Sequence, residues 1–255
     1  MLIKMVKLEQ RRLLKKRRLL FLGIIMFIAL LGGIIIYFEH STPKRTSFEV
    51  FSFATNMMLP LLLPLLAGFS TGGTLVEDRQ SGLLPLVLSR GVSPFQYVTS
   101  KVIVSAVGQG CFISGILALF LIALLPFFPT GPILTYAARH SREFAANQPA
   151  AYCLVIALIF TIAAVAFNGI ALLLSVWVKN AFVVMAAPIV FYIAALYSIG
   201  FDTPLEIALN PYVHLALGEF NVPLPLAQVV YYWIAIALIT HTLTVVAFSL
   251  KRDYA

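Results

Sequence analysis

Charged residues are scarce in this sequence: Asp, Glu, Lys and Arg together make up 11% of its 255 residues, whereas 61% are hydrophobic. A soluble domain carries roughly 25% charged residues, so the composition excludes an ordinary water-soluble fold. The mean hydropathy of +0.97 points the same way. We therefore expect a protein that is embedded in lipid.

Several features of enzymes are also missing. No Gly-x-x-x-x-Gly-Lys-Ser/Thr loop occurs, so the chain has no phosphate-binding loop and cannot hydrolyse ATP alone. The histidines at positions 40, 140, 214 and 241 are scattered, which leaves no set of side chains suited to catalysis. The two cysteines, Cys111 and Cys153, fit neither a disulfide nor a metal site and are expected to be packing residues. We expect no catalytic residue, no metal site and no enzyme activity in this chain.

Six apolar stretches are long enough to cross a bilayer. A hydrocarbon core of about 30 Å requires roughly 20 apolar helical residues, because every backbone polar group must be satisfied within the helix. The predicted spans are residues 19–38, 50–73, 98–128, 152–176, 181–200 and 228–250. The first is longer than the apolar core of about 7–15 residues in a signal peptide, so we expect it to be retained. The sequence thus predicts an all-α, polytopic membrane protein with one domain over residues 1–255.

The positive charges fall mainly on one side of this arrangement. Of the 18 lysines and arginines, only Lys44, Arg45, Arg139 and Arg142 fall on the side opposite to the termini. Short cytoplasmic loops hold more Lys and Arg than outer loops do, so we expect both termini and the loop at 75–97 to be cytoplasmic, with the protein in the cell membrane. The net charge of +8 then reflects topology and contact with anionic lipids, and it gives no support to nucleic-acid binding.

Basic residues repeat at helical spacing before the first span. They are Lys4, Lys7, Arg11, Lys15 and Arg18, with apolar residues opposite. This pattern over residues 1–18 predicts an amphipathic helix that lies in the membrane interface. A topology signal alone is the alternative, because Glu9 lies on the apolar side and weakens the amphipathic pattern.

The second predicted span contains Pro60 and Pro64, which should bend or unwind it because each proline removes a helical hydrogen bond. Such a break must face protein or water. We therefore assign both prolines to a translocation path, together with Asn56 and with Asn168 of the fourth span. For Asn56, a hydrogen bond to a neighbouring helix is the alternative. Among ionisable residues only His241 is placed inside a predicted span, which argues against an ion-coupled carrier.

Four prolines divide residues 201–227 into short pieces. Leu205–Leu209 and Tyr212–Leu217 are predicted to be two short helices that rest on, or dip into, the outer face. We expect them to form a cap over the space between the spans.

A segment with polar ends, Leu75–Pro94, lies between the second and third spans. Glu77, Asp78 and Arg79 form its charge cluster. An apolar stripe follows at Leu83, Leu84, Leu86, Val87 and Leu88. Gly91 and Pro94 end the stripe, since glycine accepts a left-handed cap and a residue before proline avoids the helical region. The pattern predicts a short amphipathic helix at a membrane face.

This segment resembles the loop after the second span in the six-span permeases of ATP-binding-cassette (ABC) type-2 transporters. In that family the loop reads acidic-x-acidic-x-Gly-Thr-Leu, then leucines, Ser-x-Pro, Ser/Arg and a Gly-Lys that opens the third span. The matching positions here are Asp78, Gln80, Gly82, Leu84, Leu86, Leu88, Ser89, Ser93 and Lys101. The sequence departs from the pattern at Gln80, Leu83, Gly91 and Ser100, and Pro85 is extra. Asn210–His214 also resembles the Pro-aromatic-x-His stretch before the family's last span, and the layout agrees over the whole chain.

The resemblance implies the permease subunit of an ATP-driven exporter. Such a subunit pairs with a second permease copy or a paralogue and with two cytoplasmic ATPase subunits, which bind ATP and Mg²⁺; it needs no cofactor of its own. The 77–94 region would transmit closure of the ATPases, since a short helix with acids at its start and an apolar face can dock rigidly. The residues assigned to this coupling role are Glu77, Asp78, Arg79, Gln80, Gly82, Leu84 and Arg90.

The cargo is expected to be hydrophobic or amphipathic, such as an antimicrobial peptide, a drug or a lipid, because the spans are apolar and no buried charge is expected. Two alternatives stay open. The first is a membrane scaffold or assembly subunit that transports nothing. The second is an ion-coupled carrier. A neighbouring reading frame for an ATPase would favour the exporter over the scaffold.

Overall fold

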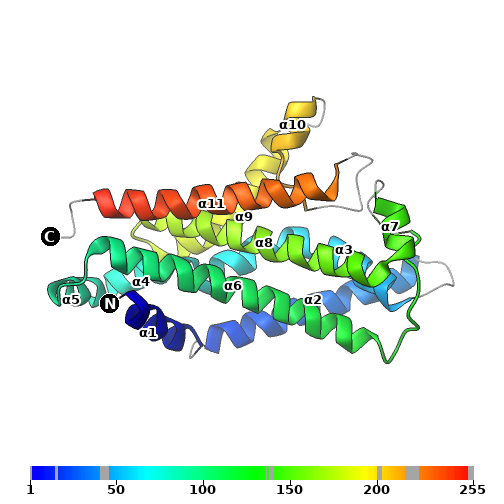
Figure 1. The fold of residues 1–255 in the computed structure, drawn as a ribbon, viewed down its shortest axis with the longest axis horizontal. Helices are drawn as coiled ribbons and strands as arrows, with labels where there is room; N and C mark the ends of the chain where they lie inside the picture. Colours follow the sequence, from blue (N-terminus) through cyan, green and yellow to red (C-terminus); the bar gives the residue numbers. More distant parts are fainter. Residues whose placement is uncertain are drawn as a thin grey trace.

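The computed structural model describes residues 2–14, 17–40, 46–135, 137, 141–199, 203–215 and 224–251. These residues form helices and connecting segments without strands (Figure 1). Six helical segments are long and apolar enough to cross a membrane. They are α2 (Arg17–His40), α3 with its continuation (Ser47–Gln80), α6 (Pro94–Leu124), α8 (Pro149–Ser175), α9 (Ala181–Ser198) and α11 (Leu226–Leu250). The prediction of an all-helical, multi-pass membrane protein is confirmed.

The long helices lie side by side, and α8 is their centre. It packs against α3, α6, α9 and α11. The first helix, α1 (Leu2–Leu14), lies at one end of the bundle with α4 (Thr74–Gln80), α5 (Leu83–Ser89) and the C-terminal end of α11 (Figure 1). We call this the terminal end. The short helix α7 (Arg142–Asn147) lies at the opposite end.

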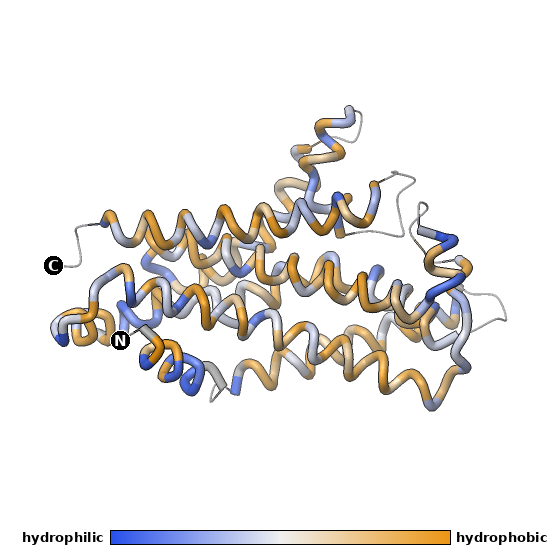
Figure 2. Tube along the Cα trace, in the orientation of Figure 1, coloured by the Kyte–Doolittle hydropathy of each residue, from blue (hydrophilic) through white to orange (hydrophobic). Residues whose placement is uncertain are grey.

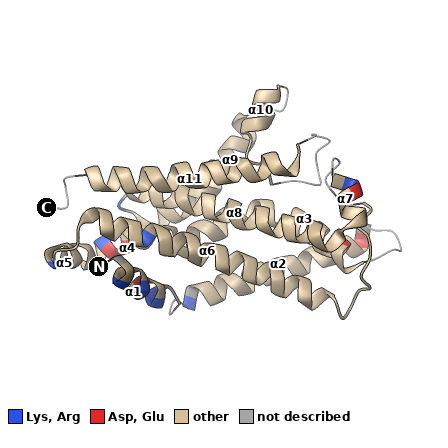
Figure 3. Ribbon diagram, viewed as in Figure 1, with Lys and Arg blue, Asp and Glu red and all other residues tan. Residues whose placement is uncertain are grey.

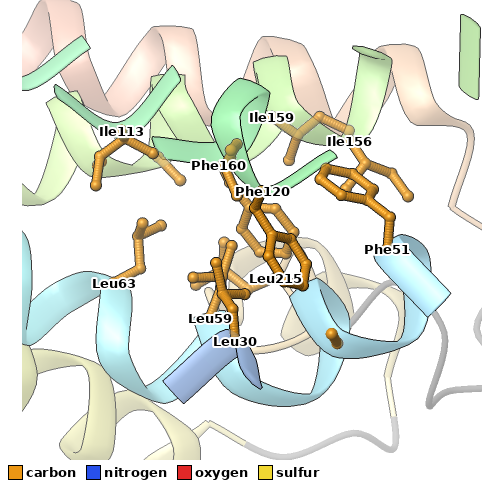
Figure 4. Close-up of a cluster of buried hydrophobic side chains, with 14 of the residues drawn as sticks. Leu30, Phe51, Leu59, Leu63, Ile113, Phe120, Ile156, Ile159, Phe160 and Leu215 are labelled. Carbon is orange, nitrogen blue, oxygen red and sulfur yellow. The ribbon is translucent and has the colours of Figure 1, made fainter. Parts of the chain in front are cut away.

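Apolar side chains from several helices fill the inside of the bundle. Leu30 of α2, Leu59 of α3, Phe120 of α6 and Phe160 of α8 converge in Figure 4, and each is at most 1% exposed. Apolar residues predominate along the long helices (Figure 2), and some of them face outward, since Leu119 of α6 is 63% exposed and Ile28 of α2 is 61% exposed. An apolar exterior of this kind is what a bilayer solvates.

Polar side chains fix where two of the spans begin. The Thr46 hydroxyl accepts a hydrogen bond from the Glu49 N–H at 3.2 Å. The Ser93 hydroxyl accepts one from the Gln96 N–H at 3.2 Å, and Pro94 takes the first position of α6, where no N–H is needed. These caps start α3 and α6 a few residues before the predicted positions 50 and 98.

The second span does not unwind at its prolines, so of the two predicted outcomes, a bend or an unwound turn, the unwound turn is wrong. Helical geometry continues through Pro60 and Pro64 as far as Ala67. The two prolines are four residues apart and therefore share one face of the helix, where both are buried and supported by neighbouring helices. The irregular turn comes after them, since Gly68–Gly72 forms a π-helical turn, η1, before α4 continues the same long helix.

One of the two short helices predicted between the fifth and sixth spans is present. It is α10 (Pro204–Leu209), which starts with a capping box between Thr203 and Glu206. Residues 211–215 form turns instead of the second predicted helix, and residues 216–217 lie outside the described residues. Leu215 is fully buried and reaches the apolar core (Figure 4), so this stretch inserts into the bundle.

Candidate functional site

Four charged side chains meet between α1, α4 and α6 at the terminal end, and we call them the ion network. Lys101 Nζ lies 2.7 Å from Glu9 Oε2 and 2.6 Å from Asp78 Oδ2. The two terminal nitrogens of Arg12 each lie 2.9 Å from a carboxylate oxygen, one of Glu9 and one of Asp78. The Tyr97 hydroxyl donates a hydrogen bond to Asp78 Oδ2 at 2.6 Å. Figure 3 shows charge gathered over α1, α4 and the beginning of α6.

Helical spacing brings these side chains together. Glu9 and Arg12 are one turn apart on α1, and Tyr97 and Lys101 are one turn apart on α6. Asp78 is 1% exposed, Lys101 4% and Glu9 7%. The two acids balance the two bases, which a buried network requires because an unpaired buried charge costs several kcal/mol. The hydrogen bond from Arg12 to Asp78 raises the pKa of the guanidinium above its ordinary value, so Arg12 stays charged.

A cavity of about 20 Å³ adjoins the ion network. Its lining includes the four charged residues together with Thr74, Val104 and Ser105. A volume of about 10–15 Å³ suffices for one water molecule in a polar surrounding. The buried hydroxyl of Thr74 has no partner among the described residues, and a water in this cavity would satisfy it. The cavity therefore extends the polar region from the charges toward Ser105.

A second buried group of polar side chains, the polar cluster, starts at Ser105, one turn along α6 from Lys101. The Ser105 hydroxyl lies 3.1 Å from the Thr71 hydroxyl and 2.5 Å from Asn168 Oδ1. Asn168 Nδ2 donates to Thr71. The Ser70 hydroxyl donates to Gln109 Oε1, while Gln109 Nε2 is buried without a partner among the described residues. Polar contacts thus join the turn at 68–72, which continues α3, with α6 and α8 inside the bundle.

The π-helical turn η1 places Ser70 and Thr71 in this cluster. Glycines allow the turn to sit close to its neighbours, because a Cβ at Gly68 would collide with the carbonyl oxygen of Met185 and one at Gly72 would collide with the side chain of Ala171. A π turn inside a long helix is frequent at functional sites. The turn is thus held between α8 and α9 with its polar residues buried.

The residues predicted to line a translocation path do not all meet. Asn168 belongs to the polar cluster. Asn56 instead donates from Nδ2 to the Ser52 carbonyl of its own helix at 2.8 Å, and it lies about 20 Å along the helix axis from Thr71 at 1.5 Å per residue. Pro60 and Pro64 lie between these two positions and are buried.

The residues predicted to couple to an ATPase separate into two groups. Asp78 is buried in the ion network, and Leu84 is 3% exposed. Arg79 donates to the Ser175 carbonyl at the end of α8, and Gln80 Nε2 donates to the Lys179 carbonyl at 2.9 Å in the turn that follows, so both tie α4 to this region.

The remaining members of this set lie toward the surface. Glu77 is half-buried, whereas Gly82 and Arg90 are exposed. Gly82 has a φ of 71°, in the left-handed region that favours glycine, and precedes the first residue of α5. Gly91 likewise has a positive φ of 79°, as predicted for the end of the apolar stripe.

An open groove of about 590 Å³, which we call the α1–α5 groove, lies beside these residues. One wall is formed by Lys4, Met5 and Leu8 of α1, and the other by Leu83, Leu86 and Arg90 of the α5 region. Leu86 is 48% exposed. The groove therefore presents apolar surface between positively charged side chains at the terminal end.

The ion network was not predicted from the sequence, and the expectation that His241 is the one ionisable residue inside a span is wrong. Lys101 lies in α6 and is buried, and Glu49 of α3 is buried at 3% exposure. The available signals were the position of Glu9 on the apolar face of α1 and that of Lys101 inside a predicted span. His241 bonds within its own helix, where Nδ1 lies 2.7 Å from the Ala237 carbonyl oxygen.

Within the described part of the chain, no group of three or more His, Cys, Asp and Glu side chains could hold a metal ion. In comparisons with known proteins, no family model and no curated protein matches this sequence.

Proposed function

We propose that this chain is the membrane-spanning permease subunit of an ATP-driven exporter. The observation that carries the proposal is the continuity of the helix over Ser47–Gln80, which joins a span directly to the α4–α5 segment. The ion network and the bonds of Arg79 and Gln80 tie this segment to α1, α6 and α8. A displacement of α5 would therefore be transmitted to several spans at once, as coupling to an ATPase requires.

The α1–α5 groove is the proposed docking place for a cytoplasmic ATPase. Arg90 and the apolar side chain of Leu86 are exposed there and suit a partner with an acidic rim and an apolar contact. Two such ATPases would bind ATP and Mg²⁺ and drive a pair of permeases, formed by two copies of this chain or by this chain and a paralogue. We place the terminal end on the cytoplasmic side of the cell membrane, because basic residues are concentrated there.

The proposed cargo path passes the polar cluster. Asn168 and Thr71 lie where the π turn interrupts regular helical geometry between three spans. Irregular backbone at membrane depth is tolerated where it is buried in protein or lines a cavity, and π turns are frequent at functional sites. The apolar remainder of the bundle favours a hydrophobic or amphipathic cargo, such as a peptide, a drug or a lipid.

The test is whether an ATPase co-purifies with the chain, and whether the amount recovered depends on Arg90. Mass spectrometry identifies the ATPase. Arg90→Glu should lower recovery by about thirtyfold or more, because losing a desolvated charge pair at an interface costs about 2–5 kcal/mol. Arg142→Glu, which makes the same charge change at the opposite end, is the control. Asp78→Lys is unsuitable, since Asp78 is buried and its replacement would disturb the fold. Recovery of no ATPase with the wild-type chain, or equal recovery with both variants, would refute the proposal.

An ion-coupled carrier is the second candidate, because the ion network supplies the buried carboxylates of Glu9 and Asp78. Reconstitution into vesicles separates the two. Cargo movement that follows an imposed proton gradient without an ATPase would favour the carrier. An absence of cargo movement with either energy source, together with stable assembly with other membrane proteins, would favour a scaffold.

A further inference from the structure

A groove of about 570 Å³, which we call the lateral groove, lies on the side of the bundle between α1, the beginning of α2 and α6. Small-molecule sites have volumes of about 300–1,000 Å³. The lining is almost wholly apolar and includes Val6, Leu19, Leu20, Val107, Phe112 and Ile116. It is thus a concave apolar surface that α1 forms together with two of the membrane-spanning helices, α2 and α6.

The wall of this groove includes a glycine, and its lining faces outward. Gly23 forms part of its wall, and a Cβ there would lie 3.5 Å from the side chains of Phe112 and Ile116. Leu20 is 70% exposed and Val107 is 58% exposed, so the lining faces outward. In a bilayer the surrounding medium is acyl chain, and an apolar hollow of this size is filled by hydrocarbon rather than water.

Positively charged residues lie within one or two helical turns of the groove lining on both α1 and α2. On α1, Lys7 lies one turn from Gln10, which lines the groove, and Arg11 lies one turn from Lys7. On α2, Arg17 lies one turn before Leu20. All three basic residues are exposed. Lys7 and Arg11 also line a separate surface hollow of about 440 Å³ on α1.

We propose that the lateral groove binds an acyl chain of an anionic phospholipid, with the phosphate held by Lys7, Arg11 and Arg17. The charge of the rim selects an anionic headgroup, and the apolar lining accepts the tail. Val104 lines both the lateral groove and the cavity beside the ion network. A bound tail therefore supports the packing of α1 against α6 next to the buried charges. This assignment does not depend on whether the chain transports a cargo.

The experiment is native mass spectrometry of the full chain in detergent, after incubation with phosphatidylglycerol or phosphatidylcholine. We expect one tightly retained lipid and a preference for phosphatidylglycerol. Each basic residue near a membrane surface contributes about a fivefold preference for anionic lipid. Lys7→Gln and Arg17→Gln should therefore each lower the preference by about fivefold, and both positions are exposed, so folding is not at risk.

A bulky side chain should close the groove. Val107→Trp is expected to abolish retention of the lipid, whereas Leu119→Trp, an exposed position further along α6 that does not line the groove, should retain it. Equal retention of the two lipids by the wild-type chain would overturn the proposal. So would equal loss in the two tryptophan variants, or a dimer that disappears only with Val107→Trp, since a second copy of the chain would then occupy the groove.

Discussion

Lys101 Nζ lies 2.7 Å from the carboxylate of Glu9, although the two residues are 92 positions apart in the sequence. This contact fastens the first helix of the protein to the third span. It is buried, and Asp78 and Arg12 complete it on the other side. The basic N-terminal helix therefore does not only lie in the membrane interface. One of its faces packs against the bundle and is part of the folded structure.

Removing Lys101 should destabilise the protein strongly. Lys101→Met leaves Glu9 and Asp78 with a single positive partner, and breaking a buried ion pair costs about 3–5 kcal/mol. The double variant Glu9→Gln/Lys101→Met removes one acid and one base, leaves the Arg12–Asp78 pair balanced, and should recover part of that loss. Thermal unfolding in detergent measures both effects.

Lys4→Met is the matched control, since Lys4 is exposed on the same helix as Glu9 and exposed pairs contribute only about 0–1 kcal/mol. Strictly additive losses for Glu9→Gln and Lys101→Met would mean that the two charges do not depend on each other, contrary to the geometry.

Because η1 packs closely against α9, a larger side chain at Gly68 should destabilise the protein. Gly68→Ala places a methyl group against the backbone carbonyl of Met185, and overpacking of this kind typically costs about 1–3 kcal/mol. Gly32→Ala is the control, because nothing lies within 4 Å of its Cβ position and alanine is favoured over glycine in a helix by about 1 kcal/mol. Opposite shifts of the unfolding temperature are expected, and a stable Gly68→Ala protein would contradict the packing.

Stability should fall in mild acid through His214. Its Nε2 lies 2.9 Å from the Ala208 carbonyl oxygen, and its ring stacks on Tyr232 with centroids 3.8 Å apart. Burial lowers the pKa of His214 below its ordinary value, with the bond to Ala208 opposing part of the shift. The unfolded chain then binds a proton more readily than the native protein, so the native state loses stability as pH falls below about 6.5.

The slope from this residue is at most about 1.4 kcal/mol per pH unit. His214→Phe keeps an aromatic ring but cannot titrate, so its unfolding temperature should change less between pH 7.5 and pH 5.5 than that of the wild type. Fluorescence of Trp233, whose indole N–H donates to the His214 carbonyl at 3.3 Å, reports on the same region. An identical pH slope in both proteins would show that another group is responsible.

The spans were predictable because a long apolar helix is encoded locally. The fifth was expected at 181–200 and runs over Ala181–Ser198, and the fourth was expected at 152–176 and runs over Pro149–Ser175. The second was expected to end at 73 but continues to Gln80. The charged residues near its end suggested a loop, whereas Asp78 is neutralised by partners on α1 and α6.

The ion network was not predictable in the same way, because its partners lie far apart in the sequence. No periodicity pairs Glu9 with Lys101. The π turn was missed for a related reason: the prolines suggested a break at their own positions, whereas the irregular turn lies where glycines let the helix approach α8 and α9. Local patterns identified the elements, and the long-range contacts decided which polar residues meet.

The orientation of the bundle gives the last prediction. Exposed basic residues are concentrated at the terminal end, among them Lys4, Lys7 and Arg90, and this bias is expected of a cytoplasmic face. Gln80 and Asn147 are exposed at opposite ends of the bundle. In a chain whose two native cysteines are replaced by alanine, Asn147→Cys should react with a membrane-impermeant thiol reagent in intact cells. Gln80→Cys should react only after the cells are permeabilised, and the reverse pattern would place the proposed ATPase-docking groove outside the cell, where no ATP-driven partner could reach it.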